Sequence, residues 1–183
     1  DYKQLIVGCA VTEGRSHTQN RRTRYNSPLA VLARQGCDNG ADQVLIHDRS
    51  ESDEDHEAVI GIMKETARTI DEPILAGGRV RRLEDVKKYL YAGASAVFLD
   101  VSREDNVDMM KEAADRFGRE KVYAYLPNVS YIPRMEEYAQ LGASVMIVRT
   151  SAQVPSLQEL GEIGEGGHET LIFCGGQDSI QDM

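Results

Sequence analysis

Two glycine pairs stand directly after short apolar runs: residues 74–81 read ILAGGRVR and residues 171–178 read LIFCGGQD. A turn without side chains exposes backbone N–H groups, and a helix that begins behind it adds its positive dipole end. Such a turn binds anionic groups such as phosphate, although an isolated glycine pair is more typical of a tight turn with positive φ. We therefore treat Gly77, Gly78, Gly175 and Gly176 as candidate phosphate-binding residues, with Ser179 as a hydroxyl donor or helix cap.

Charged side chains stand at other positions where ligands bind in α/β proteins. Asp48 and Asp100 each end a predicted strand, where an acidic side chain either faces a ligand or hydrogen-bonds to a neighbouring loop. Residues 13–27, EGRSHTQNRRTRYNS, are a basic segment in an otherwise acidic chain. Because guanidinium groups bind phosphate through two parallel hydrogen bonds, Arg15 and Arg22 are candidate ligand-facing residues, with a solvated loop as the alternative.

The composition restricts the classes of partner. The 183 residues carry 30 acidic and 21 basic side chains, and the net charge of -9 disfavours nucleic acid and anionic membranes as partners. The three cysteines, Cys9, Cys37 and Cys174, lack the spacing of a metal site, which indicates reduced thiols in a cytoplasmic protein. We expect no metal ion and no cofactor.

Short β-branched runs alternate with amphipathic stretches along the chain. The runs predict strands at residues 4–10, 43–47, 73–76, 96–99, 121–126, 144–148 and 170–174. The amphipathic stretches predict helices at residues 28–39, 53–70, 83–92, 106–117, 132–141 and 156–163. Most predicted strands are apolar throughout, which indicates a parallel sheet covered on both faces.

A Gly-Ala pair joins helix to strand three times, in NGADQVLI, AGASAVFL and LGASVMIV. Gly40, Gly93 and Gly142 lie about fifty residues apart, the length of two βα units, and the two glycine pairs lie about twice as far apart. This nested repeat indicates an α/β protein with a (βα)8 barrel of the TIM type, and the missing GxGxxG disfavours a Rossmann sheet. With about seven strands, we expect one incomplete phosphate-binding-type barrel domain over residues 1–183, truncated in its seventh helix and lacking the last βα unit.

Six segments along the chain carry a family resemblance: LIVGCAVTEGR, SPLAVLARQGCDNGADQVLIHD, IDEPILAGGRV, AGASAVFLD, FGREKVYAYL and LIFCGGQDS. They resemble the cyclase subunit of imidazole glycerol phosphate synthase and the related phosphoribosyl-formimino isomerase of histidine biosynthesis. The resemblance implies a (βα)8 barrel whose substrate carries a phosphate at each end. It places Gly77 and Gly78 on the first phosphate loop and Gly175 and Gly176 on the second, with catalytic aspartates ending the first and fifth strands.

The catalytic positions of this family pattern are changed here. Ala10 stands where the first strand carries its aspartate, and Leu126 stands where the fifth strand carries the second. General acid–base catalysis needs a titratable group within reach of the substrate, so we assign no catalytic residue and expect cyclase activity to be lost. The family's Asn-Thr after the fourth strand is replaced by Asp100 and Val101, and Ser102 is the candidate replacement for the phosphate-binding hydroxyl.

These observations favour a degenerate cyclase-like barrel domain that binds a phosphoribosyl ligand, a phosphorylated small molecule, or acts as a scaffold in histidine biosynthesis. The resemblance also extends to the N-terminal barrel of a larger polypeptide with phosphoribosyl-AMP cyclohydrolase and phosphoribosyl-ATP pyrophosphatase activities. A downstream domain or a second copy would then close the barrel. The alternatives are an active lyase or isomerase on a phosphoribosyl aminoimidazole, using Asp48 and Asp100, and a structural oligomerisation module.

Overall fold

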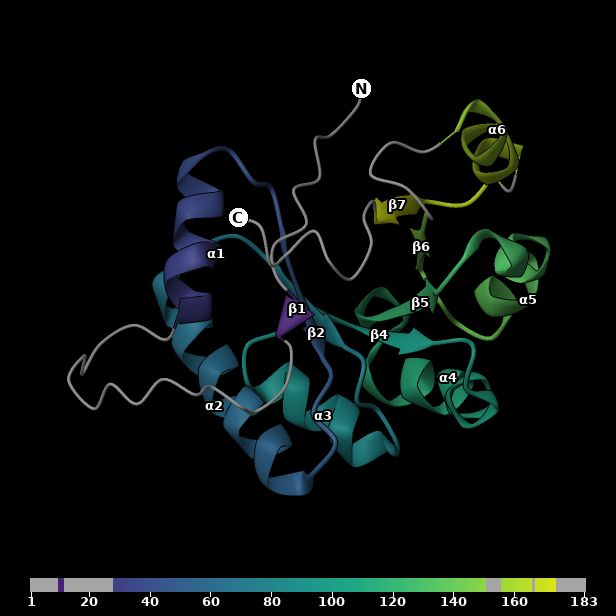
Figure 1. The fold of residues 1–183 in the computed structure, drawn as a ribbon. Coiled ribbons are helices and arrows are strands. Elements are labelled where there is room, and N and C mark those ends of the chain that lie inside the picture. Colours follow the sequence, from purple (N-terminus) through teal and green to yellow (C-terminus); the bar gives the residue numbers. More distant parts are fainter. Residues whose placement is uncertain (1–9, 12–27, 151–155, 166, 174–183) are drawn as a thin grey trace. The chain divides into compact units, whose positions relative to one another are not determined.

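The computed structural model describes residues 10–11, 28–150, 156–165 and 167–173, in which seven strands alternate with six α-helices (Figure 1). The strands are β1 (Ala10–Val11), β2 (Val44–Asp48), β3 (Ile74–Gly77), β4 (Ala96–Asp100), β5 (Val122–Leu126), β6 (Val145–Arg149) and β7 (Thr170–Phe173). The α-helices are α1 (Pro28–Asp38), α2 (Asp53–Thr69), α3 (Leu83–Tyr91), α4 (Glu104–Phe117), α5 (Met135–Gln140) and α6 (Leu157–Glu165). Two 3₁₀ helices, η1 (Arg119–Lys121) and η2 (Val129–Arg134), flank β5.

The chain divides into two compact units, residues 1–79 with 84–95 and residues 80–83 with 96–183. In the first unit β1 pairs in parallel with β2 and β2 with β3, with Ala10 opposite His47 and His47 opposite Gly77. In the second unit β4, β5, β6 and β7 pair in parallel in chain order, with Leu126 opposite Val148. This order of parallel strands and intervening helices confirms the predicted class, an incomplete α/β (βα) barrel.

Burial along the strands is nearly continuous, as expected for parallel strands covered on both faces. Every residue of β3 is buried, and four of the five residues are buried in each of β2, β4, β5 and β6. The large side chains with no exposed surface include Phe98, Met110 and Leu126. No helix in the described ranges is long and apolar enough to cross a membrane.

The predicted Gly-Ala turns are confirmed. Gly40, Gly93 and Gly142 have φ values of 96°, 111° and 116°, in the left-handed region that favours glycine. After α3, the N–H of Gly93 donates to the carbonyl of Leu90 at 3.1 Å and that of Ala94 to the carbonyl of Tyr89 at 3.1 Å. This pair of bonds is the Schellman helix stop, and the same pattern ends α1 and α5. The alanine that follows each glycine is buried.

Local signals explain where several helices begin. Ser52 caps α2, because its hydroxyl accepts the N–H of Asp55 at 3.0 Å, and three acidic residues fill the first turn. Ser156 and Glu159 form a reciprocal capping box before α6. The predicted helix at residues 132–141 is wrong at its start: Pro133 lies in the 3₁₀ helix η2, and the α-helix begins at Met135.

We expect Gly93→Ala to lower the free energy of unfolding by about 1–3 kcal/mol, because an L-residue is strained at this φ and a Cβ would lie 2.5 Å from the Cβ of Ala67. The matched control is Gly61→Ala in α2, where a Cβ would meet no atom within 4 Å. That substitution should be neutral or stabilise the helix by about 0.5–1 kcal/mol. Urea denaturation followed by circular dichroism measures both free energies of unfolding. Equal stability of the two variants would contradict the left-handed, closely packed turn at Gly93.

Candidate functional site

The carboxylate of Asp48 lies at the carboxyl end of β2 and is fully engaged by protein donors. Its Oδ1 accepts the backbone N–H of Ser50 at 2.9 Å and the Ser50 hydroxyl at 2.6 Å. Its Oδ2 lies 2.7 Å from Nδ1 of His56 in α2 and accepts the hydroxyl of Tyr89 in α3 at 2.7 Å. One carboxylate therefore ties the ends of two helices to the strand.

Burial and hydrogen bonding set the ionisation of this cluster. Burial of Asp48 favours its neutral form, but the hydrogen bonds from His56, Ser50 and Tyr89 outweigh burial and hold the pKa of Asp48 below its ordinary value. Burial, together with the charge of Asp48, raises the pKa of Tyr89 above its ordinary value. Because the carboxylate is an acceptor, Nδ1 of His56 carries the proton. Nε2 of His56 is buried without a hydrogen-bond partner among the described residues.

Asp48 and His56 are each 1% exposed, so this acid–imidazole pair is closed to solvent. Of the two roles open to Asp48, hydrogen bonding within the protein is the one that these contacts show. Its ligand-facing role stays a prediction. His56 and Tyr89 were not predicted to contact Asp48, because they lie 8 and 41 residues away in the chain and form no motif with it.

The first glycine pair closes β3. Gly77 is the last residue of the strand and is buried opposite His47, and Gly78 has a φ of 104°. A Cβ at Gly78 would lie 2.3 Å from the carbonyl oxygen of Asp48 and 2.3 Å from Cδ2 of the His47 ring. The end of β2 therefore requires a glycine here for packing alone, and phosphate binding by Gly77 and Gly78 stays a prediction.

Arg79 follows this glycine pair with a guanidinium group that is almost completely buried. Its Nη2 donates to the carboxylate of Asp53, in the first turn of α2, at 2.6 Å. The side chain of Arg79 is 6% exposed, whereas that of Asp53 is 88% exposed. A buried cation thus stands beside the candidate phosphate loop, and the three arginines within residues 79–82 are the sequence signal for it.

The end of β4 repeats the turn seen at Asp48. Oδ1 of Asp100 accepts the backbone N–H of Ser102 at 2.9 Å and the Ser102 hydroxyl at 2.6 Å. After β5, the side-chain oxygen of Asn128 accepts the same two groups from Ser130. The hydroxyl of Ser102 thus donates its hydrogen bond to Asp100, and the phosphate-binding role of Ser102 stays a prediction. The repeated Asp/Asn-x-Ser pattern was readable in the sequence and was missed.

The positions of the two family aspartates hold apolar side chains. Leu126 ends β5 with no exposed surface, opposite the equally buried Val148 of β6. Ala10 lies in β1 opposite His47. No proton can be exchanged with a ligand by either side chain. The remaining predicted site residues lie outside the described residues: Arg15, Arg22, Gly175, Gly176 and Ser179.

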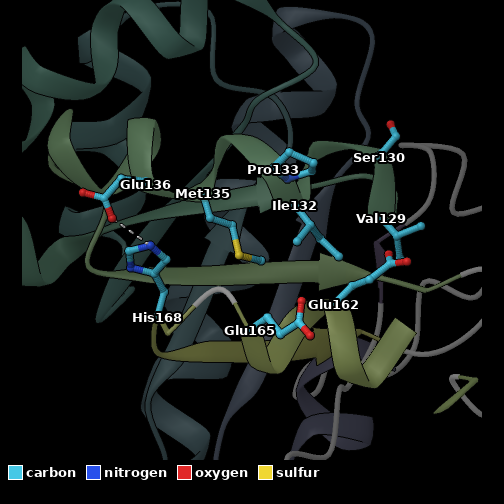
Figure 2. Close-up of a pocket in the computed structure, with 9 residues that line it drawn as sticks. All are labelled: Val129, Ser130, Ile132, Pro133, Met135, Glu136, Glu162, Glu165 and His168. Atoms are coloured by element: carbon cyan, nitrogen blue, oxygen red, sulfur yellow. Dashed lines mark ion pairs between the residues drawn. The ribbon is translucent and has the colours of Figure 1, made fainter. Parts of the chain in front are cut away.

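A groove of about 590 Å³ lies in the second unit between η2, α5 and α6 (Figure 2). Its lining residues are Val129, Ser130, Ile132, Pro133, Met135, Glu136, Glu162, Glu165 and His168. Nε2 of His168 lies 3.3 Å from the carboxylate of Glu136. No sequence signal points to this groove, because its residues come from η2, α5, α6 and the loop before β7, which share no motif.

The pH dependence of stability tests the Asp48 cluster. Because the pKa of Asp48 is lowered in the folded state, its stabilisation is complete above the unfolded-state value near 3.8 and is lost as pH falls through the folded-state value. Asp48→Asn should therefore be less stable at neutral pH and lose stability less steeply on acidification. Urea denaturation from neutral pH to about pH 2 measures this. Asp42→Asn, at an exposed position, is the control, and an unchanged acid slope in Asp48→Asn would refute the assignment.

Comparisons with known proteins give the chain its context. Imidazole glycerol phosphate synthase subunit HisF from Staphylococcus aureus strain JH9 is 33% identical over 144 residues, which cover 78% of this chain and 55% of that protein. The subunit from strain Newman is 28% identical over the same length. The chain therefore spans about half the length of these relatives.

Solved structures share the fold alone. A candidate phosphonomutase from Burkholderia cenocepacia J2315 superimposes with a TM-score of 0.58 at 17% identity, covering 82% of this chain and 84% of that one.

The family model described as histidine biosynthesis protein matches residues 5–128, more than half of the sequence. The Gly-Ala turns, the parallel strand order and these matches agree, and the chain belongs to the histidine biosynthesis protein family.

Proposed function

We propose that this chain is a catalytically degenerate, cyclase-like barrel domain of a histidine-biosynthesis protein, which binds a phosphoribosyl ligand or serves as a scaffold. Family membership and the likeness to imidazole glycerol phosphate synthase subunits support the place in histidine biosynthesis. The match covers only 55% of the length of the JH9 relative. We therefore extend the activity of such a complete protein to this chain only as part of the proposal.

The complete burial of Leu126 at the end of β5 is the observation that best supports the proposed loss of catalysis. A carboxylate at the end of β5 would have to replace a side chain that has no exposed surface and lies opposite the apolar Val148. The acids that end β2 and β4, Asp48 and Asp100, each accept two hydrogen bonds from a following serine. A general acid or base must be free to exchange a proton with the substrate, and these contacts oppose that role for Asp48 and Asp100.

The sequence around the first glycine pair supports binding of an anion. Three arginines stand within the five residues that follow Gly77, in a protein whose net charge is -9. One of them, Arg79, is buried directly after the turn and bound to the exposed carboxylate of Asp53. A phosphate would be attracted to this cationic segment more than to the rest of the acidic surface.

Turnover tests the catalytic half of the proposal. With the cyclase substrate and ammonia, we expect the chain to form imidazole glycerol phosphate at least about 10⁴-fold more slowly than the Staphylococcus aureus subunit, because each missing acid costs about 10²–10⁴-fold. Wild-type turnover within a hundredfold of the relative would overturn this half.

Calorimetry tests the binding half. We expect a phosphoribosyl aminoimidazole to bind with a micromolar Kd and its dephosphorylated nucleoside to bind far more weakly, because the phosphate supplies the charge–charge contacts. Arg15→Ala/Arg22→Ala should raise the Kd about tenfold, since each lost phosphate contact removes a charge-assisted hydrogen bond. No heat at millimolar ligand would refute binding and leave the scaffold role.

A further inference from the structure

The groove in the second unit is walled by carboxylates from two helices (Figure 2). Glu136 comes from α5, and Glu162 and Glu165 come from α6. Among the residues that the structure describes, its lining contains three glutamates and one histidine but no lysine or arginine. Figure 2 shows Glu165 between Glu162 near one end and the Glu136–His168 pair near the other, so the negative charge is distributed along the groove.

These carboxylates are accessible to a ligand. Glu162 and Glu136 accept single hydrogen bonds from the exposed side chains of Gln158 at 3.0 Å and Gln140 at 2.9 Å. The side chain of Glu136 is 70% exposed although it pairs with His168. Glutamine partners on a solvated surface are exchanged at little cost, so cationic groups of a ligand would meet three available carboxylates.

The floor of the groove is apolar. Ile132 and Met135 are 9% and 2% exposed, and Val129 and Pro133 extend the apolar lining along η2. A volume of about 590 Å³ lies within the range of small-molecule sites, about 300–1,000 Å³. The groove therefore offers an apolar surface to the body of a ligand and anionic groups to its charged ends.

This combination excludes several classes of ligand. Phosphorylated molecules would be repelled by the three carboxylates, so the groove does not suit the proposed phosphoribosyl ligand. No group of three metal-binding side chains is close enough to hold a metal ion within the described residues. A peptide would place backbone N–H and C=O groups over an apolar floor, where unpaired polar groups are costly.

From these observations we infer that the groove binds a linear aliphatic polyamine. The methylene segments lie over Ile132 and Met135, and the ammonium groups pair with the carboxylates of Glu162, Glu165 and Glu136. A linear chain with cations separated by methylenes matches acidic groups spread along an apolar floor, whereas a compact monoamine reaches one of them.

Spermidine is the probe, titrated at constant ionic strength into protein labelled at the methionine methyl groups. We expect a saturable shift of the Met135 methyl signal, because this side chain forms part of the floor. Glu162→Gln/Glu165→Gln should raise the Kd about tenfold, since each exposed ion pair contributes modestly. The control is Glu112→Gln/Asp115→Asn, which removes the same charge at the same spacing from exposed positions of α4 and should leave the Kd unchanged.

Three results would overturn the inference. The first is an unmoved Met135 signal at saturating spermidine. The second is an equal response to magnesium chloride or to an uncharged diol of similar chain length, which would indicate ionic-strength or apolar effects alone. The third is binding of an arginine-rich peptide without binding of spermidine, which would assign the groove to a protein partner.

Discussion

A glycine in the left-handed region, followed by a buried alanine, ends α1, α3 and α5 and turns the chain towards β2, β4 and β6. The turn needs both residues, because the glycine tolerates a φ above 90° and the alanine fits where helix and strand come close. A Cβ added at Gly93 would lie 2.5 Å from Ala67 in α2, and one added at Gly142 would lie 2.5 Å from Ala114 in α4. The regular spacing of strands and helices in both units depends on this constraint.

The carboxyl ends of three strands carry polar side chains that accept hydrogen bonds from within the protein. Asp48, Asp100 and Asn128 each accept two hydrogen bonds from a serine two residues later, which fixes the first turn of the following loop. Asp48 adds His56 and Tyr89, so that its buried charge is fully compensated. Asp48 and Asp100 therefore stabilise the loops that follow their strands, whereas Ala10 and Leu126 stand where the resemblance predicts aspartates.

Charge separates the possible ligands of the molecule. Three arginines follow the first glycine pair in the sequence, and residues 13–27 contain further arginines, so the proposed anion site draws on basic segments of an acidic chain. The groove along η2, α5 and α6 has the opposite character, with three glutamates over apolar side chains. The two proposed ligands, a phosphoribosyl compound and a polyamine, therefore differ in the sign of their charge.

The sequence by itself determined the fold class and the six α-helices to within a few residues, because hydrophobic period and glycine position are local properties. It also showed Ala10 and Leu126 where the resemblance predicts aspartates. It further identified Asp48, Gly77 and Gly78 as candidate site residues. Only the tertiary structure decided why: the ring of His47 and the carbonyl of Asp48 occupy the space beside Gly78, and His56 and Tyr89 converge on Asp48 from two helices. The groove could not be predicted from the sequence either, because it forms where separate elements pack together, and local residue spacing does not determine that packing.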